Sequence, residues 1–278
     1  MKALIPAAGY GTRFLPASKT IPKEMLPVGA KPAIQLIVEE ALAAGADEVV
    51  IVTSPDKPSL KRHFDADAVW HARCAKKPEI DAELTRLEEI GRRIRWTLQT
   101  EQKGLGHAVL QAADILAGET DPVLILLGDA LVSGQPPSAD MAAISRAFGG
   151  ASVVGLEQVP LEKVSRYGIV AGTPAPDAPV PEAADRVLKL SDLVEKPAPE
   201  EAPSRLAIAG RYLLDPAIFT LLATQTPGKG GEIQLTDAIR RLLSSHAVYG
   251  YRYPGRRHDI GNPQGYLETL MAFAKQEQ

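Results

Sequence analysis

Four short apolar runs in the first half of the chain constrain its fold more than any other feature. Each predicts a buried strand, and they read KALIPA (2–7), EVVIVTS (48–54), IRWTLQ (94–99) and PVLILLGD (122–129). An apolar stripe with helical spacing between Pro32 and Gly45 predicts a helix after the first strand, and GHAVLQAADIL (106–116) predicts another after the third. Strands that alternate with helices in this way form βαβ units. We therefore expect a mainly parallel sheet with flanking helices, which binds its ligands beyond the carboxyl ends of the strands.

The second half of the chain predicts more strands than helices. Strands are expected over 151–159, 167–172, 186–196 and 205–214, and helices over 232–245 and 263–276. The Pro- and Ala-rich stretch 172–185 predicts an exposed hairpin tip, and the charged stretch 64–93 predicts a solvated helical insertion. Since no repeat and no linker divides the sequence, we expect one elaborated α/β domain over residues 1–278, with an additional smaller β region.

Composition and charge exclude several classes of protein. A hydrophobic fraction of 45% and a charged fraction of 23% are those of a folded globular chain. A net charge of -3 provides no general field for nucleic acid or an anionic membrane, so we expect neither as a partner. Cys74 is the only cysteine, and no apolar run predicts a signal peptide or a membrane span. We expect a cytoplasmic protein.

The stretch Gly9–Phe14 begins like a dinucleotide fingerprint, but Phe14 occupies the position of its third glycine. The next strand ends in Thr53 and Ser54, without the acid that would bind a ribose hydroxyl, and the P-loop pattern is absent from the chain. A nicotinamide oxidoreductase and a P-loop enzyme are therefore disfavoured.

A glycine loop followed by cations suits a nucleoside triphosphate. Backbone N–H groups of Ala8, Gly9 and Gly11 can approach a ligand closely, while Arg13 and Lys23 can neutralise phosphates. Taken alone, the loop is equally compatible with an exposed turn that carries incidental basic residues.

Two further strand ends carry candidate ligand-binding groups. Asp129 follows the most apolar strand, where its carboxylate could hold Mg²⁺ or cap a turn. Glu195 and Lys196 end another strand, so their side chains point to opposite faces unless the backbone bends there. If both bind one ligand, a bulge or turn is required; otherwise they form an exposed ion pair. His63, His71 and Cys74 lack zinc-site spacing, so no transition metal is expected.

The stretch IPAAGYGTRFLPASKTIPKEMLPV (5–28) resembles the signature of bacterial UTP-glucose-1-phosphate uridylyltransferases, a branch of the sugar-1-phosphate nucleotidylyltransferases. Further blocks of that family are matched in order by QKGLGHAV, LVEKPAPEEAPSRLAIAGRYLL, GGEIQLTDAI and RHDIGNPQGY. The departures, in DADAVWHARC and LLGDALV, are local and leave the packing of the insertion and the subunit contacts open.

The resemblance implies a Rossmann-like fold and the Mg²⁺-dependent reaction of UTP with glucose 1-phosphate, giving UDP-glucose and pyrophosphate. It implies a nucleotide-binding half (1–130), a sugar-phosphate-binding half (150–262), a C-terminal helix (263–278) and a homodimer or homotetramer. The catalytic residues would be Arg13, Lys23, Asp129 and Lys196. The nucleotide would be bound by Ala8, Gly9, Gly11, Glu24, Gln99 and Gly104, and the sugar by Tyr167, Gly168, Glu195 and Gly210. The metal ligands would be Asp129 and Asp259.

Two alternatives remain open at this stage. The first is the same chemistry with dTTP, CTP or another sugar 1-phosphate, because a few pocket contacts decide the base and the sugar. The second is a regulatory protein that binds nucleotide sugars without catalysis.

Overall fold

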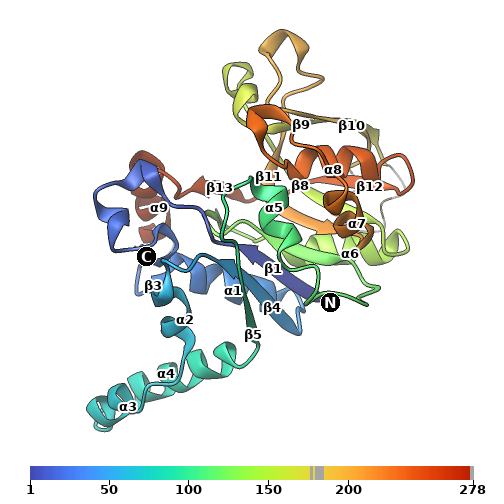
Figure 1. Ribbon diagram of the computed structural model, residues 1–278. Coiled ribbons are helices and arrows are strands. Elements are labelled where there is room, and N and C mark those ends of the chain that lie inside the picture. The colour runs from blue at the N-terminus through green and yellow to red at the C-terminus, as the bar shows by residue number, and fades with distance from the viewer. Residues whose placement is uncertain (176–177, 179–184, 276–278) are drawn as a thin grey trace.

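A nine-stranded sheet forms the centre of the molecule (Figure 1). The computed structural model describes residues 1–175, 178 and 185–275, so the expected hairpin tip at 172–185 lies largely outside the described residues. The order across the sheet is β5-β4-β1-β6-β11-β8-β12-β10-β9. Its strands are β1 (Lys2–Pro6), β4 (Glu48–Thr53), β5 (Ile94–Leu98), β6 (Val123–Leu126), β8 (Ser152–Gln158), β9 (Gly168–Pro174), β10 (Val187–Glu195), β11 (Leu206–Leu214) and β12 (Val248–Arg252).

The first four strands in this order are parallel, as the βαβ pattern predicts. β1 pairs in parallel with β4 and β6, and β4 pairs in parallel with β5. Among the strands of the second half only β8 and β12 are parallel, and the other pairings are antiparallel. The sheet as a whole is therefore mixed: the predicted smaller β region continues the parallel sheet and joins it where β11 lies antiparallel to β6.

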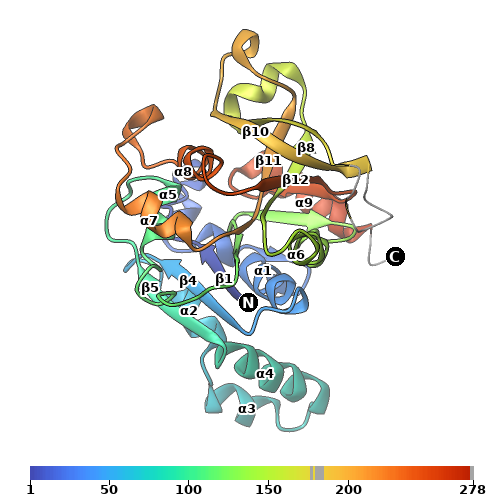
Figure 2. The same ribbon diagram turned by 90° about the vertical axis from the view of Figure 1, so that its right-hand side faces the viewer.

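Helices cover both faces of the sheet (Figure 2). α1 (Ala33–Ala43) and α6 (Ser138–Ala147) pack on one face, and α5 (Leu105–Leu110), α7 (Ala217–Ala223) and α8 (Leu235–Leu242) pack on the other. Ile5 of β1 enters the first core and Leu4 enters the second, because successive side chains of a strand point to opposite faces.

Two predicted helices are shorter in the structure than in the sequence pattern. α5 ends at Leu110, and the chain continues through turns in which Ala112 N–H donates to Val109 and Ala113 N–H to Leu110. α8 begins only at Leu235, because Ile233 bridges to another loop and cannot also be helical.

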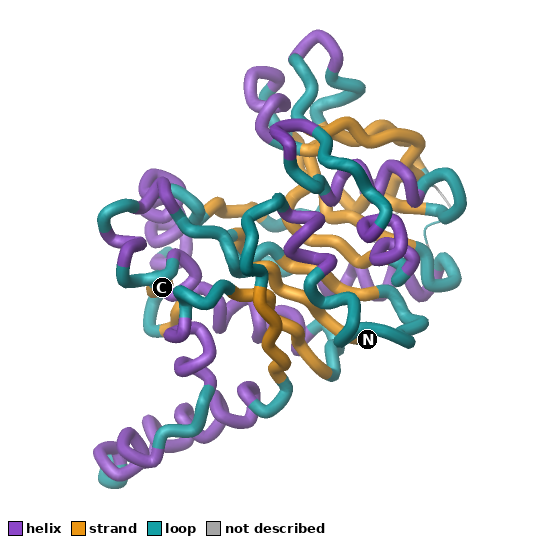
Figure 3. Tube along the Cα trace, viewed as in Figure 1, coloured by secondary structure: helices purple, strands orange, loops and turns teal. Residues whose placement is uncertain are grey.

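A helical arm extends from the body below β5 (Figures 1 and 3). It consists of α3 (Ala68–Cys74) and α4 (Pro78–Gly91), which follow α2 (Pro58–Phe64). His71 of α3 lies between two carboxylates of α4, 2.6 Å from Asp81 and 2.9 Å from Glu88. Most residues of the arm are exposed, which confirms the prediction of a solvated helical insertion.

Two small sheets and a last helix complete the fold. β2 (Pro27–Val28) pairs with β3 (Lys31–Pro32), and β7 (Ala130–Ser133) pairs with β13 (Arg256–Asp259). α9 (Pro263–Ala274) follows β13, with Asn262 as its N-cap. None of the described helices combines the length and the apolar character needed to cross a lipid bilayer.

An ion pair with a fully buried arginine ties the sheet to α1. Arg211 of β11 donates to both carboxylate oxygens of Glu40 at 2.9 and 2.7 Å, and its side chain has no solvent exposure. The same guanidinium donates to the carbonyls of Gly210 and Ala130, and the Ser138 hydroxyl donates to Glu40. These bonds hold α1, α6, β7 and β11 together.

Candidate active site

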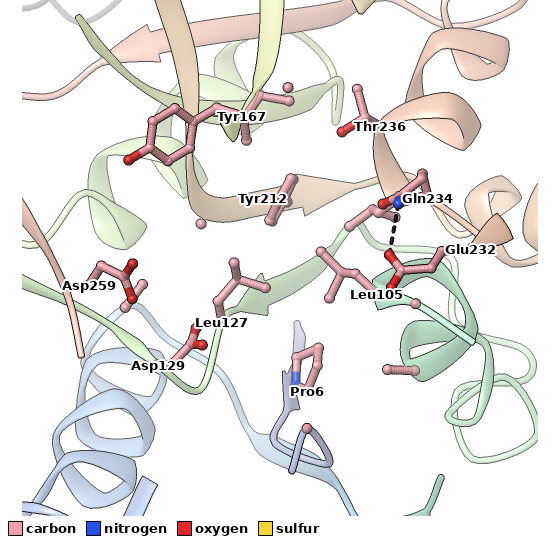
Figure 4. A pocket seen from close by; sticks show the side chains of 18 of the residues that line it. Pro6, Leu105, Leu127, Asp129, Tyr167, Tyr212, Glu232, Gln234, Thr236 and Asp259 are labelled. Atoms are coloured by element: carbon pink, nitrogen blue, oxygen red, sulfur yellow. Dashed lines mark hydrogen bonds between the residues drawn. The ribbon is translucent and has the colours of Figure 1, made fainter. Parts of the chain in front are cut away.

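A cleft of about 520 Å³ lies beyond the carboxyl ends of β1, β5 and β6. Every residue that the sequence analysis assigned to the site lines this cleft, with the exception of Gly11: Ala8, Gly9, Arg13, Lys23, Glu24, Gln99, Gly104, Asp129, Tyr167, Gly168, Glu195, Lys196, Gly210 and Asp259. Figure 4 shows Asp129 and Asp259 on one side of the cleft and Glu232 and Gln234 on the other. The cleft therefore receives side chains from both halves of the sequence.

Gly11 determines the backbone conformation of the loop and does not line the cleft. Its φ of 65° lies in the left-handed region, where a side chain would be strained. A Cβ at this position would lie 3.5 Å from Ser18 and 3.6 Å from the stem of Lys23. Gly11 thus faces the inside of its own loop, which explains why it does not line the cleft as the sequence analysis expected.

Lys23 and Asp129 form an ion pair at the floor of the cleft. The Lys23 ammonium lies 2.5 Å from Oδ2 of Asp129. Burial alone would raise the pKa of Asp129, but the charge and the hydrogen bond of Lys23 and the charge of Arg13 hold this pKa below its ordinary value. Asp129 is therefore a carboxylate at neutral pH.

Two carboxylates, Asp129 and Asp259, meet beside Gly261. A Cβ added to Gly261 would lie 2.8 Å from Oδ1 of Asp259, 3.1 Å from Oδ2 of Asp129 and 3.0 Å from Nη2 of Arg13. Within the described ranges no cluster of three or more His, Cys, Asp or Glu side chains could hold a metal ion. Mg²⁺, however, commonly takes one or two carboxylates and completes its octahedron with waters and substrate phosphates. The two aspartates fit such an ion.

Glu24 is buried next to the glycine loop and bonded to a residue that the sequence analysis did not select. Both of its carboxylate oxygens accept from the ammonium of Lys57, at 3.0 and 2.8 Å. Glu24 is only 1% exposed, so this pair is nearly dry. Lys57 lies three residues after the second predicted strand, and this position near a strand end was its only local signal.

Glu195 and Lys196 both line the cleft because the backbone turns between them. β10 ends at Glu195, and Lys196 has a φ of 47°, in the left-handed region. The bend breaks the alternation that would point two adjacent strand side chains to opposite faces. The Lys196 ammonium also lies 3.1 Å from Oε1 of Glu195, so the ion pair expected as the alternative is present as well. The N–H of Lys196 donates to the carbonyl of Tyr167, and the Lys229 ammonium donates to the carbonyl of Lys196.

Glycine allows a close approach of the main chain at Gly168 of β9 and Gly210 of β11. A Cβ on Gly168 would lie 2.7 Å from Oγ1 of Thr236, and Gly210 has a φ of 74°. Beside them, the guanidinium of Arg257 lies 4.8 Å from the ring centroid of Tyr167 and donates to Glu157 at 2.6 Å. Tyr167 is thereby held against a buried cation.

Hydrogen bonds also fix the side of the cleft that is formed by the glycine loop and the loop after β5. Gln99 bonds to His107 at 2.9 Å, and Gln102 donates to the carbonyl of Ala8 at 3.1 Å. His107 itself does not line the cleft.

One segment, residues 228–234, touches both sides of the cleft. Ile233 exchanges backbone hydrogen bonds with Lys103 and Gly106, and a Cβ on Gly104 would lie 2.8 Å from the carbonyl of Ile233. At its other end, Lys229 reaches Lys196. The segment thus joins the loop after β5 to the end of β10.

Several residues that line the cleft were missed from the sequence: Gln102, Arg166, Glu232, Thr236 and Arg257. Most of them lie within three residues of an assigned position or inside a block that carried the resemblance, so their place in the sequence was the available signal.

The fold and the cleft are those of a nucleotidyl transferase. The family model described as "Nucleotidyl transferase" matches residues 2–276, and the chain therefore belongs to this family.

Among curated relatives, UTP--glucose-1-phosphate uridylyltransferase 2 of Staphylococcus saprophyticus is 42% identical over 278 residues, covering 100% of this chain and 93% of the relative. A crystal structure of UDP-glucose pyrophosphorylase complexed with UDP-glucose is 39% identical, with a TM-score of 0.84 over 99% of this chain and 98% of that one. A UTP-bound enzyme from Acinetobacter baumannii is 36% identical, with a TM-score of 0.85 over 99% and 93%. These similarities confirm the resemblance and the α/β fold class inferred from the sequence.

Proposed function

We propose that this protein transfers the uridylyl group of UTP to glucose 1-phosphate, releasing pyrophosphate and forming UDP-glucose. The observation that carries the proposal is one cleft in which the glycine loop with Arg13 and Lys23 faces the Glu195–Lys196 bend. The relatives named as UTP--glucose-1-phosphate uridylyltransferases and the solved complexes with UTP and UDP-glucose support this choice of substrates.

The nucleotide half, residues 1–130, would bind UTP. Backbone groups of Ala8, Gly9 and Gly104 approach the nucleoside, with Glu24 and Gln99 as polar partners. Arg13 and Lys23 would stabilise the triphosphate and the departing pyrophosphate, because cations already in place act on the developing charge without reorganising.

The sugar-phosphate half, residues 150–262, would bind glucose 1-phosphate. The Lys196 ammonium is suited to its phosphate and the Glu195 carboxylate to sugar hydroxyls, while Gly168 and Gly210 let the main chain come close to the ring. Tyr167 would form the side of this pocket. The sugar phosphate is already an anionic nucleophile, so the protein aligns it for in-line attack on the α-phosphorus and needs no covalent intermediate.

Mg²⁺ is the proposed cofactor, and Asp129 and Asp259 would hold it. When bound, the ion supplies positive charge to the phosphate oxygens of both substrates. Lys23 holds Asp129 in place on the floor of the cleft. We also propose that α9 (Pro263–Ala274) completes the fold; residues 276–278 of the expected C-terminal helix lie outside the described residues. The protein is proposed to assemble as a homodimer or homotetramer, which light scattering measures.

The decisive experiment measures pyrophosphate release with Mg²⁺ across a grid of nucleoside triphosphates and sugar 1-phosphates. We expect the highest kcat/KM for UTP with glucose 1-phosphate. A maximum with dTTP, CTP or another sugar phosphate would overturn the stated specificity, and ligand-dependent melting shifts without any pyrophosphate release would favour a regulatory protein.

Two variants test the assigned roles within that assay. Lys196→Ala and Asp129→Asn should each lower turnover by at least about a hundredfold, because each removes a charge that acts on the reacting phosphates. Their thermal unfolding should stay close to that of the matched control Lys163→Ala, which removes an exposed lysine outside the cleft. Unchanged turnover in either variant would remove that residue from the mechanism.

A further inference from the structure

Lys57 is a buried lysine that does not line the cleft. It lies between β4 and α2 and is 6% exposed. Its ammonium donates to the carbonyls of Ala7 at 2.8 Å and Gly9 at 2.6 Å, and to both carboxylate oxygens of Glu24. All of its hydrogen-bonding capacity is therefore used on the glycine loop and on one residue of the cleft.

These bonds fix the direction in which the carbonyls of the loop point. Lys57 holds the carbonyls of Ala7 and Gly9 from behind, whereas the carbonyl between them, that of Ala8, accepts from Gln102 on the cleft side. Ala8 and Gln102 both line the cleft. The ammonium thus draws two carbonyls away from the ligand side and leaves one facing it.

The charge of Glu24 depends on the same lysine. In the described part of the chain, Lys57 is the only side chain that donates a hydrogen bond to this carboxylate, and the neighbouring Lys23 is bonded to Asp129. Burial raises the pKa of Glu24 and lowers the pKa of Lys57, so each group needs the opposite charge of the other to stay ionised.

We propose that Lys57 is a positioning residue for the nucleotide site, holding the loop of residues 7–9 and the Glu24 carboxylate as one preorganised unit. The inference rests on the proposed function, because it assigns the nucleotide to this side of the cleft. Among the described residues, Lys57 forms its hydrogen bonds with Ala7, Gly9 and Glu24 and none with the Glu195–Lys196 bend, so its effect should be confined to the nucleotide.

The test compares Lys57→Met with the matched control Lys61→Met, which removes an exposed lysine of α2 that pairs with Asp65 on the surface. Binding of UTP is measured by calorimetry, independently of turnover, and the KM of each substrate by pyrophosphate release. Lys57→Met should raise the Kd and the KM for UTP by at least about tenfold, because charge-assisted bonds that set the loop are lost. The KM for glucose 1-phosphate at saturating UTP should stay within about twofold, and Lys61→Met should leave both substrates unchanged.

A second comparison separates the contribution of the loop bonds to UTP binding from that of the Glu24 carboxylate. It also tests the inference if Lys57→Met does not fold. In Glu24→Gln, Lys57 still holds the carbonyls of Ala7 and Gly9, whereas the double variant Lys57→Met/Glu24→Gln loses them without leaving a buried charge. The double variant should bind UTP about tenfold more weakly than Glu24→Gln.

Equal binding by these two variants, or a parallel rise of both KM values in Lys57→Met, would overturn the inference. Failure of the proposed function is distinguishable, because the wild-type protein would then release no pyrophosphate from UTP and glucose 1-phosphate.

Discussion

Replacing Arg211 by Met should destabilise the protein more than almost any other single substitution. The change removes four hydrogen bonds from a side chain with no exposure: two to Glu40 and one each to the carbonyls of Gly210 and Ala130. It leaves the Glu40 carboxylate, whose side chain is 8% exposed, with the hydroxyl of Ser138 as its one remaining hydrogen-bond partner among the described residues.

The magnitude follows from the charge that is left behind. Breaking a buried ion pair on one side costs about 3–5 kcal/mol, because the remaining charge stays out of water without compensation. For a chain of this size, a loss of that order lowers Tm by about 10 °C. The double variant Arg211→Met/Glu40→Met removes both charges and should be more stable than Arg211→Met. In both variants the carbonyl of Ala130 loses the guanidinium as a donor, whereas that of Gly210 still accepts from the N–H of Leu127.

Urea unfolding followed by circular dichroism measures both variants, with calorimetry for Tm. A loss below about 1 kcal/mol in Arg211→Met, or a double variant less stable than the single one, would refute the reasoning. The first result would mean that Glu40 finds another partner or becomes neutral at little cost. The second would mean that the packing of Glu40 and its bond from Ser138 stabilise the protein by more than the uncompensated charge destabilises it.

Two further predictions concern the cleft and the arm. Gly168→Ala should raise the KM for glucose 1-phosphate about tenfold and leave the KM for UTP unchanged, because the new Cβ would lie 2.7 Å from Oγ1 of Thr236. Initial rates measure both KM values. An equal rise of the two KM values would contradict a role of Gly168 on the sugar side. The hydrogen bonds to Asp81 and then Glu88 raise the pKa of His71 above its ordinary 6.5. The stability that this histidine contributes is therefore present below about pH 6.5 and is lost as the pH rises through the higher pKa of the folded state. Hydrogen-exchange protection of α3 and α4 should fall over the same pH range. A difference between the wild-type protein and His71→Gln that does not change with pH would contradict this prediction.

The parallel half of the sheet could be predicted because its apolar runs are compatible with few other structures. The ends of parallel strands meet at one edge, so Asp129 and the glycine loop after β1 could be placed near each other before any coordinates existed. The bend at Lys196 was also foreseeable, since two adjacent side chains of a strand cannot otherwise face one ligand.

What escaped prediction depends on partners far away in the sequence. β12 lies between β8 and β10, and its mixed residues, VYGYR, take their strand form from that pairing rather than from a local pattern. The pairing of Arg257 with Glu157 spans 100 residues and leaves no local signal. Lys57 was overlooked because a lysine after a strand is usually exposed, and only the fold shows that the glycine loop covers it.

The segment of residues 228–234 has a consequence for how such an enzyme can be altered. Because Ile233 is bonded to the loop that carries Gly104, and Lys229 to the backbone of Lys196, one strip of chain borders the proposed sites of both substrates. Exchanging this strip between relatives would therefore change the preferences for nucleotide and sugar together. The helices α3 and α4 line no part of the cleft, and a chimaera that replaces them would keep both preferences.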